Sequence, residues 1–165
     1  MRPSTRGLIL FAAGTILGMV TIKTIDAQQE KGLGVRVNHV GIAAKNLQET
    51  LDFYEKTLGM REGFVMRDAS GNPTTYGIQV DKNTFLEISQ ANANRPAGLN
   101  HFAVETPNMN ATAAELRKRG LTVPDPTSAG SGAPHSSIND PNGIRLEFIE
   151  FAEGSMQRKA VESFR

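Results

Sequence analysis

The sequence predicts a single α+β domain built from two copies of one βαβββ module. Three observations lead to this fold class. An Asn-His dipeptide occurs twice, at 38–39 and 100–101, each time within a strand-like run. Each copy continues into a stretch with apolar residues at helical spacing and ends on an apolar run that contains a Glu. The His-to-Glu interval is 48 residues in the first copy (39 to 87) and 46 in the second (101 to 147).

The first 27 residues are expected to lie outside the fold. Arg2 and Arg6 give a positive start, residues 7–22 carry no charge, and a small residue stands at Ala27. This pattern is typical of a secretory signal peptide and predicts an exported protein, either periplasmic or secreted. The alternative is an uncleaved N-terminal membrane anchor, although this apolar run is shorter than the roughly 20 residues that span a bilayer. We expect contact with a membrane only in that case.

Composition restricts the function classes that remain. The chain has 165 residues, 39% hydrophobic and 21% charged, which suits one globular domain with a core. Its net charge is +1 and it has no basic block, so no nucleic-acid partner is expected. It has no Cys, which excludes disulfides and thiolate ligands. Any metal ligand must therefore be His, a carboxylate or a neutral oxygen.

The first module is predicted to span residues 35–90. It begins with a strand at 35–44, and a helix follows with apolar residues at helical spacing and Gly59 at its C-terminal end. Turn-forming residues then divide three further strands, which are predicted at 60–67, 74–81 and 84–90.

The second module is predicted to span residues 97–151 in the same order. Its strands are expected at 98–106, as a weak run near 121–124, and at 134–139 and 143–151, with a helix over 107–120 that starts at a Pro. The stretch 125–134 is rich in Pro, Gly and Ser and is a candidate lid. Residues 152–165 are expected to form a polar C-terminal tail outside the domain.

Strand alternation places four titratable side chains on faces with small neighbours. His39, Glu87, His101 and Glu147 each lie opposite the apolar face of their strand, which outlines a cleft with a polar centre. Buried carboxylates are costly unless they are paired or bound to a metal. Singly, each residue could be structural or solvated, but the matched repeat favours a shared divalent cation: Ni, Zn, Co, Mn or Fe(II). Such an ion, with positions open to substrate, could polarise a carbonyl and stabilise an enediolate.

Two further residues are candidates for substrate binding. His135 precedes a predicted strand and could donate a proton, or it could be a loop His in contact with solvent. Arg145 lies on the same strand face as Glu147. It could bind a substrate carboxylate or phosphate, or it could form an ion pair with Glu147 or Glu150.

Four stretches of the chain resemble the vicinal oxygen chelate superfamily, and in particular its glyoxalase-I-like members. They are VNHVGIAAKNLQETLDFYEKTLGM, TFLEIS, LNHFAVE and NDPNGIRLEFIEF. The resemblance covers residues 36–151 and implies two βαβββ modules that form a curved mixed sheet around a central metal cleft. It implies His39, Glu87, His101 and Glu147 as metal ligands, with Glu147 as the catalytic base and Glu87 assisting it.

The implied activity is that of a metal-dependent lyase or isomerase that transfers a proton at a metal-bound enediolate of a small oxygenated substrate. One alternative is an Fe(II) extradiol-type dioxygenase with His39, His101 and Glu147 as ligands, but an acidic Glu87 favours proton transfer. Another is a non-catalytic, exported small-molecule binding protein. Ala43 stands where glyoxalase I has an Arg for glutathione, so another substrate is expected. A homodimer is the expected assembly, with modules paired within one chain or exchanged between two.

Overall fold

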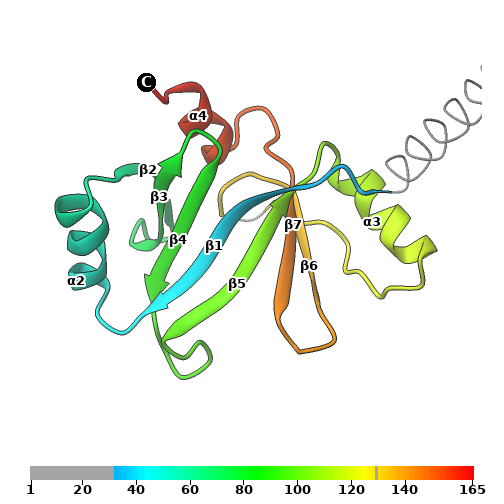
Figure 1. Cartoon of the computed structure of the whole chain (residues 1–165), viewed down its shortest axis with the longest axis horizontal. Helices are drawn as coiled ribbons and strands as arrows, with labels where there is room; N and C mark the ends of the chain where they lie inside the picture. The colour runs from blue at the N-terminus through cyan, green and yellow to red at the C-terminus, as the bar shows by residue number, and fades with distance from the viewer. Residues whose placement is uncertain (1–31, 129) are drawn as a thin grey trace, which may run out of the picture. The chain divides into compact units, whose positions relative to one another are not determined.

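Seven strands form one curved, unclosed mixed sheet in the order β2-β3-β4-β1-β5-β7-β6 (Figure 1). The structure is a computed structural model that describes residues 32–128 and 130–165, and residues 34–165 form one compact unit. The strands are β1 Arg36–Ala44, β2 Arg61–Arg67, β3 Pro73–Asp81, β4 Thr84–Gln90, β5 Gly98–Glu105, β6 His135–Asn139 and β7 Arg145–Ile149. The predicted fold class is confirmed. The predicted signal peptide, residues 1–27, lies outside the described residues.

The two modules meet at the centre of the sheet, where β1 pairs antiparallel with β5. Within each module the first strand pairs in parallel with the last, β1 with β4 and β5 with β7. The remaining neighbours are antiparallel. The four central strands are therefore those that carry the two His and two Glu of the sequence repeat.

The helix of the first module has two parts. The α-helix α2, Leu47–Asp52, begins where the side chain of Asn46 accepts a hydrogen bond from the backbone N–H of Glu49. It continues as a π-helical turn, η1, Phe53–Thr57. The chain leaves this turn through Gly59 at a φ of 71°, the left-handed conformation that the sequence predicted for this C-cap. Leu51 packs with Ile78 and Ile88 of the sheet.

The second module differs from the prediction because no strand forms at 121–124. Its helix, α3, spans Met109–Lys118. Residues 119–128 and 130–134, which follow, form no helix or strand apart from a bridge between Thr127 and His135. Pro124 and Pro126 lack the N–H groups that a strand ladder needs. The carbonyl of Val123 instead accepts from Arg117 at 2.8 Å. The second module therefore contributes three strands to the sheet, whereas the first contributes four.

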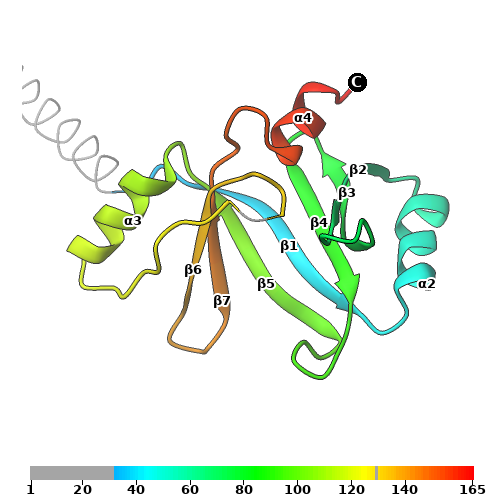
Figure 2. The ribbon, with the colours of Figure 1, turned by 180° about the vertical axis from the view of Figure 1, so that it is seen from behind.

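The segment 152–165, expected as a polar tail, contains the helix α4, Met156–Glu162. Ser155 caps its N-terminus by accepting from the backbone N–H of Arg158. Ala160 of α4 is buried in the cluster that holds Phe64 and Phe85, and the helix lies beside the ends of β2 and β4 (Figures 1 and 2). This helix belongs to the same unit as the sheet and brings Gln157 into the interior. No helix of the described residues is long and apolar enough to cross a membrane.

Candidate metal centre

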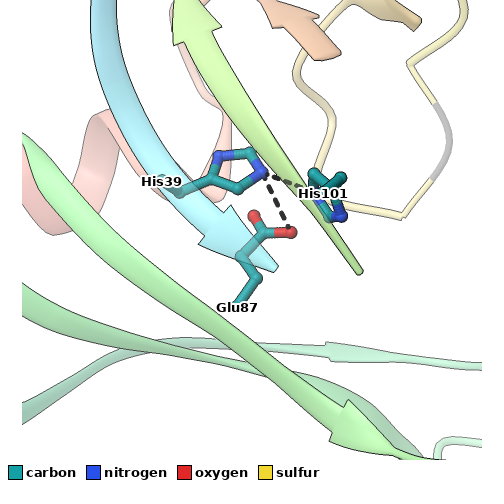
Figure 3. A group of neighbouring side chains, drawn as sticks. All are labelled: His39, Glu87 and His101. Carbon is teal, nitrogen blue, oxygen red and sulfur yellow. Dashed lines mark hydrogen bonds and ion pairs between the residues drawn. The ribbon is translucent and has the colours of Figure 1, made fainter. Parts of the chain in front are cut away.

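His39, Glu87 and His101 meet on one face of the central strands (Figure 3). The Nε2 atoms of the two imidazoles are 2.9 Å apart, and the Nε2 of His39 is 3.6 Å from the Oε2 of Glu87. All three side chains are buried, and one potential ligand atom from each lies within 4.8 Å of the others. Three of the four predicted ligands therefore converge on one point.

The fourth predicted ligand, Glu147, lies beside this group. Its Oε1 is 3.7 Å from the Nε2 of His39, and its Oε2 is 4.0 Å from the Nε2 of His101. Oε2 also accepts a hydrogen bond from the Nη2 of Arg145 at 2.7 Å. Of the two roles that the sequence left open for Arg145, the structure shows the ion pair with Glu147. Glu150 instead accepts from the backbone N–H of Met109.

Two matched irregularities in the β1–β5 pairing explain the repeated Asn-His dipeptide. Val37 pairs with Val104 and His39 with Ala103, which leaves Asn38 as an extra residue on β1. Across the same pair of strands Gly41 faces His101 and Ile42 faces Leu99, which leaves Asn100 as the extra residue on β5. Successive side chains of a regular strand point to opposite faces, whereas a bulge re-aims one of them. Each Asn can therefore reach the imidazole that follows it.

These contacts fix the orientation of both imidazoles. The Oδ1 of Asn38 lies 2.8 Å from the Nδ1 of His39, and the Oδ1 of Asn100 lies 2.9 Å from the Nδ1 of His101. The Nδ2 of Asn38 donates to the backbone carbonyl of Asn83 at 3.2 Å, so its oxygen must be the atom that faces His39. Nδ1 of His39 then carries the proton, and the matching contact of Asn100 favours the same tautomer for His101, in which both Nε2 lone pairs point toward the shared centre.

This donor set fits a divalent cation. Two Nε2 lone pairs only 2.9 Å apart repel each other unless a positive charge lies near both. Burial, followed by the charge of neighbouring basic groups, lowers the pKa of His39 to about 3 and that of His101 to about 4, so protonation is a poor source of that charge. Neutral imidazoles with a carboxylate are a usual ligand set for Zn, Ni, Co, Mn or Fe(II).

The ring of His101 packs directly against the backbone of Gly41, in the space that a side chain at position 41 would occupy. A Cβ at position 41 would overlap the Cε1 and Nδ1 atoms of this ring. Glycine at this position therefore permits the close approach of His101 to β1.

A comparison with known families agrees with this geometry. The family model described as Glyoxalase/Bleomycin resistance protein/Dioxygenase superfamily matches residues 36–148, which is most of the chain. The chain belongs to this superfamily. The predicted resemblance is therefore confirmed. No curated protein matches the chain significantly.

Solved structures share the glyoxalase-superfamily fold with this chain. A hypothetical protein from Bacillus halodurans has a TM-score of 0.61 at 18% identity, covering 74% of this chain and 98% of its own. A methylmalonyl-CoA epimerase from Streptomyces coelicolor, in complex with 2-nitronate-propionyl-CoA, has a TM-score of 0.60 at 21% identity. This match covers 71% of the present chain and 97% of the epimerase. The methylmalonyl-CoA epimerase from Mycobacterium tuberculosis has a TM-score of 0.58 at 20% identity, and the match covers 70% of the present chain and 87% of the epimerase. At these identities the likeness shows the fold.

The centre of this superfamily member opens into a cavity of about 170 Å³. Glu87, His101 and Glu147 line it, and so do both predicted substrate-binding residues, His135 and Arg145. The Nδ1 of His135 donates to the carbonyl of Ala133 at 3.1 Å, and its Nε2 has no hydrogen-bond partner among the described residues.

Two residues that the sequence did not single out also line the cavity. Gln157 of α4 is buried, and its Nε2 donates to the Oε1 of Glu87 at 3.4 Å. Arg95 reaches the cavity from the loop between β4 and β5. Ser131, from the predicted lid 125–134, is a further lining residue. Gln157 and Glu87 are 70 positions apart, and no local pattern in a polar C-terminal segment could reveal that contact.

Removing the outer hydrogen bond of His39 should weaken metal binding. Asn38→Ala loses the acceptor that holds the imidazole in one tautomer, and outer partners of metal ligands typically contribute about 10–100-fold in affinity. We expect a loss of that size when Zn²⁺ affinity is measured by competition with a chelator. Asn110→Ala, an exposed change on α3, is the control and should bind as the unmodified protein does. Equal affinity in Asn38→Ala would show that Asn38 does not orient the ring.

The metal-free protein should lose stability between about pH 6.5 and 8. Burial, together with the charge of Glu147, raises the pKa of Glu87 from 4.5 to about 8, so the folded state holds a proton that the unfolded state releases. Stability from this group is complete below pH 4.5 and is lost as the pH rises to about 8. The lowered pKa of His39 acts in the opposite direction, but only below its ordinary value of 6.5.

The expected loss over that interval is up to about 2 kcal/mol. Urea unfolding of chelator-treated protein at the two pH values measures it. Saturation with Zn²⁺ should abolish the difference, because a cation stabilises the ionised Glu87, and Glu87→Gln should abolish it without metal. A metal-free protein whose stability is unchanged over this interval would contradict the assignment.

Proposed function

We propose that the chain is a metal-dependent lyase or isomerase of the glyoxalase type that moves a proton between adjacent carbons of a small oxygenated substrate. The observation that carries this proposal is the position of Glu147. Its carboxylate lies beside the group of His39, Glu87 and His101, 3.7 Å from the Nε2 of His39, and it lines the same cavity. A set of metal-binding residues with an adjacent carboxylate is what proton transfer next to a carbonyl requires.

His39, Glu87 and His101 would hold the metal ion, for which Ni, Zn, Co and Mn are the candidates. When bound, the ion would act as a Lewis acid that polarises an oxygen of the substrate. The chain itself fixes these ligands. Asn38 and Asn100 orient the two imidazoles, and Gln157 donates to the Oε1 of Glu87.

Glu147 would accept the proton from one substrate carbon and return it to the next. Burial raises the pKa of this carboxyl, which makes it a better proton acceptor than an exposed Glu, while interactions with His135 and Arg145 lower the same pKa. Arg145 holds Oε2 at 2.7 Å, so Oε1 is the oxygen available for the transfer.

The experiment that tests the proposal is hydrogen exchange into substrate candidates. Protein loaded with Zn²⁺, Ni²⁺, Co²⁺ or Mn²⁺ is incubated in D₂O with small hydroxy and oxo compounds, and NMR follows deuterium at the carbon next to the carbonyl. Metal-dependent exchange supports the proposal. Oxygen uptake on catechols with Fe(II) and no exchange would favour the dioxygenase. Tight binding of these compounds without either reaction would favour a binding protein.

We also propose that the enzyme is exported, on the strength of the N-terminal pattern of residues 1–27. Mass spectrometry of protein expressed with its full N-terminus should find a mature chain that begins after Ala27. A full-length chain that sediments with membranes would favour the uncleaved anchor.

A further inference from the structure

The cavity contains two buried polar atoms that have no partner, one donor and one acceptor. Among the described residues, only the Nε of Arg95 and the Oε1 of Gln157 are buried side-chain atoms without a hydrogen bond. Both residues line the cavity at the metal centre. A buried polar group without a partner is unfavourable, so both atoms are positions where a bound molecule would gain a hydrogen bond.

Arg95 is held in place by its backbone. It lies in the short loop 91–97 between β4 and β5, where Asn92 and Arg95 exchange two backbone hydrogen bonds of 2.9 and 3.1 Å. The ion pairs formed by the described residues do not include Arg95, whereas Arg145 is already bound to Glu147. Arg95 is therefore the cationic side chain of this cavity whose charge is not matched by a protein carboxylate.

The charge of the cavity favours an anion. Arg95 and Arg145 bring two positive charges to the lining of the cavity. Among the described residues, Glu87 and Glu147 are the only carboxylates that line the cavity, and a divalent cation would balance their two charges. An anionic ligand would balance the remaining positive charge, and guanidinium groups bind planar carboxylates with two hydrogen bonds.

The size of the cavity restricts this anion. Its volume of about 170 Å³ is below the roughly 300–1,000 Å³ that is usual for pockets of drug-sized ligands. The part of the ligand that lies inside the cavity is therefore small. A hydroxyl or enol group on the same molecule would supply the donor that the Oε1 of Gln157 lacks.

We infer that the substrate is a small hydroxy or oxo carboxylic acid whose carboxylate is bound by Arg95. This inference rests on the proposed function and adds to it the chemical class of the substrate and the residue that selects that class. Arg95 would discriminate an acid from its neutral amide, because only the acid offers a carboxylate to the unpaired guanidinium.

The test measures binding of lactate and lactamide to Zn²⁺-loaded protein by calorimetry. The two compounds share the hydroxyl group and differ only in the carboxylate. We expect lactate to bind at least about tenfold more tightly than lactamide, and Arg95→Gln to lose that advantage. Arg67→Gln is the matched control. It removes the same charge, but Arg67 is exposed and lies outside the cavity.

Three results would overturn the inference: lactamide binding as tightly as lactate, Arg95→Gln binding lactate as the unmodified protein does, or no binding of lactate, pyruvate or malonate at millimolar concentration. Equal binding of the two compounds by the unmodified protein would overturn the inference even if Arg95→Gln fails to fold. Zinc content is measured on every sample. Protein that binds no zinc would contradict the proposed function. Zinc-loaded protein that does not prefer lactate to lactamide would contradict only the role of Arg95.

Discussion

Glu147→Gln is expected to keep its metal and to lose at least about a hundredfold of the hydrogen exchange rate. General acid–base groups typically contribute about 10²–10⁴-fold, and the amide has no basic oxygen that could accept the proton. The three residues that converge, His39, Glu87 and His101, remain in place, so the metal content should not change. The measurement is the rate of deuterium incorporation by NMR, together with elemental analysis of the same sample.

Glu115→Gln is the control for this variant. Glu115 is a partly exposed residue of α3 that pairs with Arg119, and its replacement should leave both readouts unchanged. If Glu147→Gln loses its metal, Glu147 is a fourth ligand, as the family resemblance implied. If exchange continues at the original rate, another group carries the proton and the proposed mechanism is wrong.

His101→Ala should purify without metal. The change removes one of the three donors that converge, and a direct ligand contributes more than the about 10–100-fold that is typical of an outer partner such as Asn100. It also removes the facing lone pair that lies 2.9 Å from the Nε2 of His39, so the remaining imidazole and carboxylate no longer need a shared cation. We expect elemental analysis to find near-stoichiometric metal in the unmodified protein and almost none in the variant.

A second readout separates loss of metal from loss of fold. The absorption spectrum of Co²⁺-loaded protein reports the ligand set directly, and His101→Ala should lose the bands that the unmodified protein shows. His135→Ala is the matched control, because His135 lines the same cavity but is not part of the three-residue group. Full metal content in His101→Ala, or equal loss in both variants, would place the centre elsewhere.

Much of the architecture was predictable because it follows from local rules. The strands β1, β3, β4 and β5 lie within a residue or two of their predicted bounds, since alternation and turn residues act over a few positions. The run at 121–124 was the weakest prediction, and two prolines together with the hydrogen bond from Arg117 to Val123 keep it out of the sheet. The repeated Asn-His dipeptide was recognised as a pattern, but its reason, a bulge in each strand, requires the pairing of β1 with β5.

The sequence by itself determined that two His and two Glu occupy equivalent strand positions, because strand parity and the internal repeat are both written in the order of residues. Tertiary structure alone decided how these residues divide: His39, Glu87 and His101 converge, while Arg145 binds Glu147 beside them. It also brought Gln157 and Arg95 to the cavity. Contacts between segments so far apart in the chain depend on how α4 and the loop after β4 pack on the sheet, and no local periodicity encodes that packing.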